Sequence, residues 1–135
     1  MQGGANLTDT GTPFATAKPT PIWFNTVPDV PSRSALATDV CVPISRLAEC
    51  VTAASEKAAE LGLFTPLVGH VGDGNFHMSP LIDADDPDEV ARTEEYAGWL
   101  ADLAISMEGT CTGEHGIGQG KRPYLTKEIG PATRY

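Results

Sequence analysis

Cysteine is scarce in this sequence, and the few that occur stand far apart. The chain holds Cys41, Cys50 and Cys111 in 135 residues, and no two of them form a C-x-x-C pair. An odd number at wide spacing argues against a disulfide framework, and the missing pair argues against a thiolate zinc site. We therefore expect reduced thiols in a cytosol-like compartment, with Cys41 and Cys111 as small core residues.

Basic residues are also few. Nine Lys and Arg residues oppose 18 Asp and Glu residues, which gives a formal net charge of -9. Proteins that bind nucleic acids draw much of their affinity from basic side chains, so this composition argues against a nucleic-acid partner. Residues 73–108 hold ten acids and a single base, Arg92. This bias indicates either a solvated helix face or a surface that repels anionic lipid headgroups.

Long apolar runs are missing as well. The stretch from Leu61 to Val71 is interrupted by Gly, Thr, Pro and His residues, whereas a membrane span needs about 20 apolar residues in succession. We therefore expect no membrane span. The N-terminal residues show neither the pattern of a secretory signal nor the arginines of a mitochondrial presequence. The expected location is the cytoplasm, or the mitochondrion if the source is a eukaryote.

The chain divides by composition after residue 33. Residues 1–33 contain five prolines and no periodic apolar pattern, and proline suits neither a helix interior nor a central strand. We predict a poorly ordered Pro- and Thr-rich segment over 1–33 and one domain over 34–135.

Residues 34–135 alternate between strand and helix patterns. Apolar residues at three- and four-residue spacing predict a helix that ends before Gly62 and a second one that begins after Asp86 and ends before Gly109. The first stripe comprises Ile44, Leu47, Val51, Ala54, Ala58 and Leu61, and the second Val90, Ala97, Leu100, Ala104 and Met107. Strands are predicted at 39–42, 64–70, 75–82 and 110–112, with a short helix after them.

The resulting order is β-α-β-β-α-β. It predicts an α+β domain with a ferredoxin-like antiparallel sheet and both helices on one face, truncated at its C-terminal end.

All three histidines lie in two glycine-rich segments. His70 and His77 flank a tight turn, so a hairpin would bring both imidazoles to one neighbourhood. Glu114 follows the predicted fourth strand and could add a carboxylate. These donors suit zinc, manganese or iron(II), and three protein ligands would leave positions open for a substrate. His115 would then be free to act as a base or as a substrate contact.

A simpler interpretation stays open beside the metal site. His70 and His77 could be core histidines next to a glycine-rich turn, because an H-x6-H spacing is not a specific metal signature. The glycine-rich turns are not phosphate loops, since neither contains G-K-[ST]. Lys121 and Arg122 could steer an anionic substrate or could be ordinary solvated charges.

The two histidine segments together resemble a known family. Residues 69–77 (GHVGDGNFH) and 109–118 (GTCTGEHGIG) are similar to the C-terminal domain of FAD-linked oxidases, a family that includes D-lactate dehydrogenase (cytochrome), the glycolate oxidase FAD subunit and D-2-hydroxyglutarate dehydrogenase. The resemblance runs from about Thr38 to Gly130. Residues 39–45 (DVCVPIS) look most like the D-lactate branch.

The resemblance implies a function and a role for each site residue. A divalent metal, zinc or manganese, would be held by His70, His77 and Glu114 and would bind the substrate 2-hydroxyl. His115 would take the hydroxyl proton while hydride passes to FAD, and Asn75 matches a position close to the flavin. The implied reaction is oxidation of D-lactate to pyruvate by a flavin-dependent dehydrogenase. Ala37 and Ser79 replace a lysine and an asparagine of the 2-hydroxyglutarate branch, which favours a monocarboxylate substrate.

Parts of the family pattern are not found in this sequence. The FAD-binding domain and the closing C-terminal helix have no counterpart, so we expect an incomplete enzyme that needs an FAD-binding domain or subunit, with an electron acceptor that the residues do not identify. The alternative is a catalytically inactive metal-binding fragment of such an enzyme, from a split or truncated gene. A third hypothesis, a ferredoxin-like effector-binding module, explains the fold but not the histidines.

Overall fold

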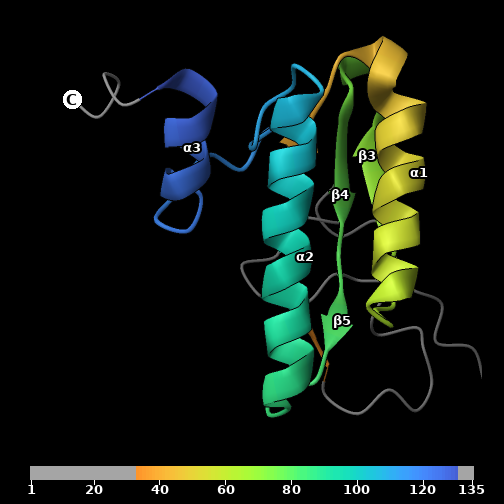
Figure 1. The fold of residues 1–135 in the computed structure, drawn as a ribbon. Coiled ribbons are helices and arrows are strands. Elements are labelled where there is room, and N and C mark those ends of the chain that lie inside the picture. Colours follow the sequence, from red (N-terminus) through yellow and green to blue (C-terminus); the bar gives the residue numbers. More distant parts are fainter. Residues whose placement is uncertain (1–32, 131–135) are drawn as a thin grey trace, which may run out of the picture. The chain divides into compact units, whose positions relative to one another are not determined.

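The computed structural model describes residues 33–130. The predicted poorly ordered segment 1–33 therefore lies outside the described residues, apart from Arg33. The elements are β1 (Ser34–Ala35), β2 (Val40–Cys41), α1 (Ile44–Glu60), β3 (Leu67–His70), the 3-10 turn η2 (Val71–Asp73), β4 (Asn75–Met78), β5 (Leu81–Ile82), α2 (Pro87–Ser106) and α3 (Arg122–Ile129) (Figure 1).

The strands form antiparallel pairs in the order β2-β4-β3, with β1 paired to β5. Ser34 lies opposite Ile82 and Val40 opposite Phe76, so β1–β5 and β2–β4 share one register. The predicted strand 75–82 is broken in the middle because Pro80 has no N–H to donate to the ladder. The N–H of Met78 is also diverted, since it donates to the Thr38 hydroxyl at 2.9 Å instead of to a main-chain oxygen.

The predicted fourth strand is reduced to a single bridge. Thr110 pairs with Cys41 in antiparallel fashion, which sets the order Thr110, β2, β4, β3 expected of a ferredoxin-like sheet. The strand stops there because the N–H of Cys111 donates to the Glu128 carboxylate at 2.9 Å and the Thr112 hydroxyl donates to Asp39 at 3.1 Å. The predicted strand 110–112 was therefore too long, although its place in the sheet is confirmed.

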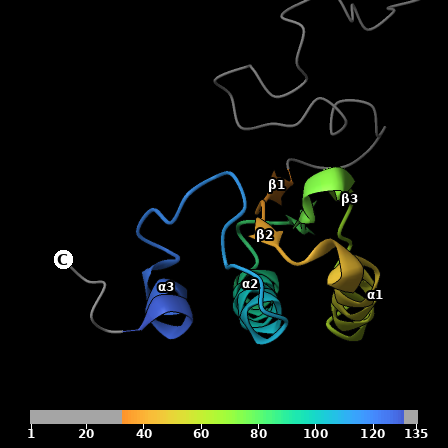
Figure 2. The same cartoon turned by 90° about the horizontal axis from the view of Figure 1, so that it is seen from above.

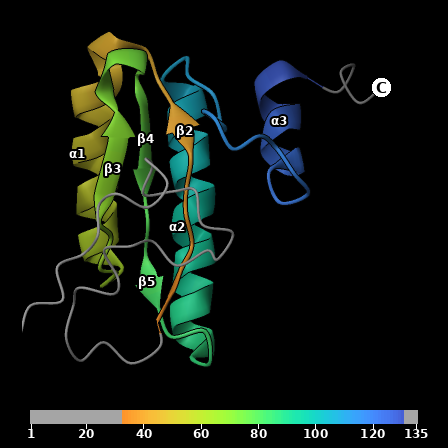
Figure 3. The same cartoon turned by 180° about the vertical axis from the view of Figure 1, so that it is seen from behind.

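Both long helices cover the same face of the sheet, as predicted. Seen from above, α1 and α2 lie together on one side of the strands (Figure 2), and from behind, β3, β4 and β2 lie in front of the two helices (Figure 3). The core fills the space between these layers. Its buried members are Val40, Val42, Leu47, Cys50, Ala54, Ala58, Phe76, Met78, Tyr96, Leu100, Ala104 and Met107.

The helix stripes were predicted in part. Leu47 and Ala54 of α1 and Leu100 of α2 are buried as expected, but Ile44 is 62% exposed. Ile44 is the first residue of α1, so the periodic pattern extends to a position at the helix end whose side chain is exposed. Tyr96 was missed, although it is fully buried and its hydroxyl donates to the Ala54 carbonyl at 3.1 Å, which joins the two helices.

The start of α2 follows the prediction. The Asp86 side chain accepts hydrogen bonds from the N–H groups of Asp88 and Glu89, and Pro87 occupies the first turn. The helix ends at Ser106, before the predicted end at Glu108, which adopts a positive φ of 62°. Within residues 33–130, no helix is both long enough and apolar enough to cross a membrane.

The core predicts a clear contrast between two substitutions. Leu100→Ala removes a fully buried side chain and is expected to lower the free energy of unfolding by about 2–5 kcal/mol. Ile44→Ala removes an exposed side chain and should change it by no more than about 0.5 kcal/mol. Urea denaturation followed by circular dichroism measures both, and equal losses would show that the packing described is wrong.

Candidate functional site

The candidate site occupies the face of the sheet that the helices leave open. Side chains of successive strand residues point to opposite faces. Because Phe76 and Met78 of β4 point into the core, Asn75 and His77 point to the open face. His70 lies opposite Asn75 at the end of β3, so the hairpin brings both histidines to one end of the sheet.

Glu114 completes a group with the two histidines. Its Oε1 lies 3.0 Å from Nε2 of His77 and 3.5 Å from Nε2 of His70. The three residues each offer one ligand atom, and these atoms all lie within 4.8 Å of one another. Metal bonds of about 2.1 Å at tetrahedral or octahedral angles separate ligand atoms by about 3.0–3.4 Å. The donor set therefore fits a divalent metal with only small side-chain movements.

The His77 ring is held from behind by a main-chain carbonyl. Its Nδ1 lies 3.0 Å from the Thr38 carbonyl oxygen, which can only accept, so Nδ1 carries the proton and donates. The Nε2 atom then presents a lone pair toward Glu114. A lone pair and a carboxylate oxygen at 3.0 Å repel each other unless a proton or a metal cation lies between them. Histidine ligands to metals are commonly held in this way by a carbonyl behind the ring.

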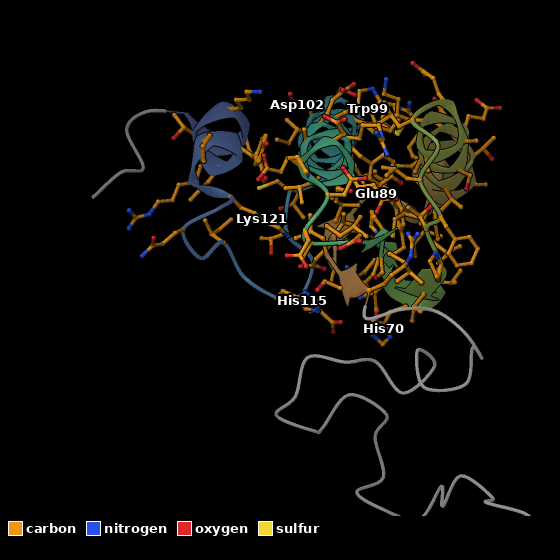
Figure 4. All side chains as sticks on the ribbon, turned by 90° about the horizontal axis from the view of Figure 1, so that it is seen from below. His70, Glu89, Trp99, Asp102, His115 and Lys121 are labelled. Atoms are coloured by element: carbon orange, nitrogen blue, oxygen red, sulfur yellow. The ribbon has the colours of Figure 1, made fainter. Side chains whose placement is uncertain are left out.

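His115 lies beside the group. Its ring stacks on the His77 ring with centroids 4.9 Å apart, and its Nε2 lies 3.7 Å from Oε1 of Glu114. Two successive residues reach the same site because residues 112–118 have no regular strand geometry. The imidazole of His115 is about half exposed, and in Figure 4 it lies with His70 on the side of the molecule away from the helices.

Asp39 is the residue of this site that sequence reasoning missed. Its carboxylate is fully buried, and it accepts hydrogen bonds from the backbone N–H groups of residues 113, 114 and 115 at 2.8–3.2 Å. Burial raises the pKa of Asp39, but the hydrogen bonds from His115, Asn75 and Glu114 and the charge of Lys121 lower it by more, so the pKa of this carboxyl lies well below the usual range. The available signal was an acid at the first position of the predicted strand 39–42, directly before three apolar residues.

Asn75 lies against this carboxylate. Its Nδ2 donates to Oδ1 of Asp39 and to the carbonyl of Val40, both at 2.9 Å. Its Oδ1 is buried and has no hydrogen-bond partner among residues 33–130. An open cavity of about 370 Å³ lies alongside, lined by Cys41, His70, Asp73, Asn75, Gly113 and Glu114.

Lys121 serves neither of the two roles considered from the sequence. Its Nζ donates to the main-chain carbonyl of Asp39 at 2.7 Å and lies 3.5 Å from the Asp39 carboxylate. Lys121 is therefore neither a free charge that could steer a substrate nor an ordinary solvated charge, because its ammonium group balances the buried Asp39 carboxylate. Arg122, by contrast, is exposed.

The cysteines are all free. Cys111 is fully buried, as predicted, and burial raises the pKa of its thiol to about 11, with a further contribution from Glu128. The prediction that Cys41 is a core residue is wrong, because Cys41 lies opposite Asn75 on the open face and is only half-buried. Burial, and then the Asp39 and Asp73 carboxylates, raise the pKa of the Cys41 thiol.

The sequence model of the family described as FAD linked oxidases, C-terminal domain, matches residues 23–134. The chain belongs to this family. It is 46% identical over 109 residues, 81% of its length, to a probable mitochondrial D-lactate dehydrogenase of Danio rerio, of which the match covers 22%. It is 41% identical over 74% of its length to the mitochondrial D-lactate dehydrogenase [cytochrome] of Arabidopsis thaliana, of which 18% is covered.

Glycolate oxidase subunits are also similar. The GlcD subunit of Bacillus subtilis is 38% identical over 67% of this chain, and the match covers 19% of that protein. The chain thus spans about a fifth of the length of these relatives. The family assignment made from residues 69–77 and 109–118 is confirmed, and the domain boundary after residue 33 stays a prediction.

Helix α3 secures the loop that carries Glu114 and His115. Glu128 accepts hydrogen bonds from the Thr110 hydroxyl at 3.1 Å and from the N–H of Cys111 at 2.9 Å. Lys127, its neighbour, forms an exposed ion pair with Asp102 of α2 at 2.7 Å. A half-buried carboxylate that binds main chain should stabilise more than a solvated ion pair does.

This difference is measurable by amide hydrogen exchange. Glu128→Ala is expected to remove about 1–3 kcal/mol from the local stability, so the protection of the Cys111 amide should fall by about 5- to 150-fold. Lys127→Ala, on the same helix, should change that protection by less than about fivefold, since exposed pairs contribute about 1 kcal/mol or less. Equal effects would show that α3 does not secure the loop through Glu128.

Proposed function

We propose that this chain forms the metal- and substrate-binding part of a flavin-dependent dehydrogenase that oxidises a D-2-hydroxy acid, D-lactate in the first place. The observation that carries the proposal is the convergence of His70, His77 and Glu114, with His115 stacked beside them. The names of the similar proteins, D-lactate dehydrogenases and glycolate oxidase subunits, support the same class of substrate.

The three proposed metal ligands are His70, His77 and Glu114. Two imidazoles and one carboxylate suit zinc or manganese, and three protein ligands leave room for a substrate. The open cavity beside them gives a small hydroxy acid access. When bound, the divalent metal would acidify the substrate hydroxyl and FAD would accept the hydride from the α-carbon.

His115 is the proposed general base. A base must lie within hydrogen-bonding reach of the proton that it removes, and Nε2 of His115 lies 3.7 Å from Oε1 of the ligand Glu114. A hydroxyl group bound next to Glu114 would therefore be close to this nitrogen. The stacking on His77 holds the ring in place, and its half exposure lets the proton pass on to water.

Substrate size is proposed from two neighbouring positions. Ala37 and Ser79 stand where the 2-hydroxyglutarate branch has a lysine and an asparagine, and neither could bind a second carboxylate by charge. This favours a monocarboxylate such as D-lactate or glycolate.

The proposed partner is an FAD-binding domain or subunit. Asn75 keeps its proposed place near the flavin, on the ground of its buried and unpartnered Oδ1 among the described residues. The electron acceptor is left open. Mitochondrial relatives support a mitochondrial location if the source is a eukaryote.

Metal content tests the ligand set. The chain should bind one equivalent of Zn²⁺ or Mn²⁺, measured by elemental analysis after loading and desalting. His77→Ala breaks the ligand set and should reduce the content to background, whereas His115→Ala removes only the proposed base and should leave it unchanged. If both variants lose the metal, or neither does, the division between ligands and base is wrong.

Activity tests the base. The chain alone is expected to oxidise no D-lactate and to bind little FAD, because the cofactor supplies the redox chemistry. Joined to or co-expressed with an FAD-binding domain of the family, it should oxidise D-lactate, and His115→Ala should lower kcat by about 10²–10⁴-fold with the metal retained. Near-normal turnover of that variant would place the base elsewhere.

A further inference from the structure

We infer that Asp39 is the positioning residue of this site: its buried carboxylate holds the backbone of Glu114 and His115 so that both side chains face the two histidines. The inference rests on the proposed function for the roles of those residues. It adds to the site a residue that directly precedes β2 and touches neither metal nor substrate.

The contacts are concentrated on one short loop. The Asp39 carboxylate accepts the N–H of Gly113 at 2.8 Å, of Glu114 at 3.0 Å and of His115 at 2.9 Å. It also accepts the Thr112 hydroxyl at 3.1 Å. These donors lie 73 to 76 residues away in the sequence, so the carboxylate folds the loop back onto the sheet.

Three successive N–H groups around one carboxylate form an anion-binding concavity of the backbone. Because the bonds use main-chain donors, the side chains of Glu114 and His115 stay free. A regular strand would point two successive side chains to opposite faces, and this arrangement replaces the strand ladder at these residues. The same geometry therefore explains how a ligand and a base can be neighbours in the sequence.

The carboxylate also touches the sheet half of the site. Its Oδ1 accepts the Asn75 amide at 2.9 Å and lies 3.6 Å from Nδ1 of His77. Thr38, the preceding residue, supplies the carbonyl that orients the His77 ring. A shift of Asp39 would therefore move His77 and the loop together. The distance between the proposed ligands His77 and Glu114 thus depends on the position of the Asp39 carboxylate.

Gly113 shows how closely the loop packs against the side chains of Asp39 and Asn75. A Cβ at this position would lie 1.8 Å from Nδ2 of Asn75 and 2.7 Å from Oδ1 of Asp39. A larger residue must move the loop or the Asn75 amide away from the carboxylate, while the carboxylate itself stays in place in the sequence. Gly120, in the same loop, has no atom within 4 Å of such a Cβ and no positive φ, so it offers a matched control.

The experiment uses Asp39→Asn, Gly113→Ala and Gly120→Ala in the full chain, with Mn²⁺ as the probe. Amide hydrogen exchange of residues 113–115 in the metal-free chain reports on the loop. Mn²⁺ affinity, measured by electron paramagnetic resonance, reports on the ligands. Leu100→Ala serves as a second control, because it destabilises the core without touching the site.

Asp39→Asn and Gly113→Ala should both lower the protection of these amides at least tenfold and weaken Mn²⁺ binding by about 10–100-fold, the usual effect of removing a group behind a metal ligand. Gly120→Ala and Leu100→Ala should bind Mn²⁺ as the unmodified chain does. If Asp39→Asn does not fold, Gly113→Ala still decides the matter.

The two proposals fail differently. An unmodified chain that binds no Mn²⁺ or Zn²⁺ contradicts the proposed metal site, while a loss of amide protection in both Asp39→Asn and Gly113→Ala would still show that Asp39 holds the loop. An unmodified chain that binds Mn²⁺, together with a Gly113→Ala variant of the same affinity and protection, would overturn the positioning role of Asp39. So would an equal loss of affinity in Leu100→Ala.

Discussion

The site depends on one buried carboxylate. Removing a charge from water is costly unless the charge is paired and hydrogen-bonded, and Asp39 meets that condition with backbone N–H groups of a distant loop, an amide from Asn75 and the ammonium group of Lys121. Because these partners come from β4, the loop and the segment before α3, the carboxylate joins three parts of the chain. Loop and sheet are consequently held at a distance that lets Glu114 meet the histidines.

The two faces of the sheet differ in what they contact: one packs against the helices, and the other carries the candidate site. Core residues such as Phe76 and Met78 pack against α1 and α2, and the alternate residues Asn75 and His77 face the candidate site. Helices α1 and α2 therefore stabilise the strands from the face opposite the site. Helix α3 acts differently, since Glu128 binds the start of the loop that carries Glu114.

Much of the fold could be predicted from periodicity, because helix stripes and strand runs are local patterns. The element order and the placement of both helices on one face followed from it. The errors lie where a contact distant in sequence overrides the local pattern: Glu128 and Asp39 draw residues 111 and 112 out of the predicted strand. The prediction that Ile44 belongs to the buried stripe was wrong. The spacing of apolar residues along a helix does not show where the packed part of the helix ends.

The residues of the candidate site could be predicted from the sequence, but the groups that hold them in place could not. Histidines and a glutamate among glycines are visible in the sequence, and the hairpin that joins His70 to His77 is a local feature. Asp39 was missed because three of its hydrogen-bond donors are main-chain N–H groups more than 70 residues away, and backbone donors carry no signature in a sequence. The same holds for the Thr38 carbonyl behind His77.

We propose that His70, His77 and Glu114 bind one metal ion together. Anomalous X-ray diffraction from crystals of the zinc-loaded chain, recorded on both sides of the zinc absorption edge, tests it most directly. We expect a single anomalous peak about 2.0–2.2 Å from a ring nitrogen of each histidine and from a Glu114 carboxylate oxygen, with His115 outside bonding distance. A peak bound by His115 in place of one of these residues, or no peak on the open face of the sheet, would contradict the account.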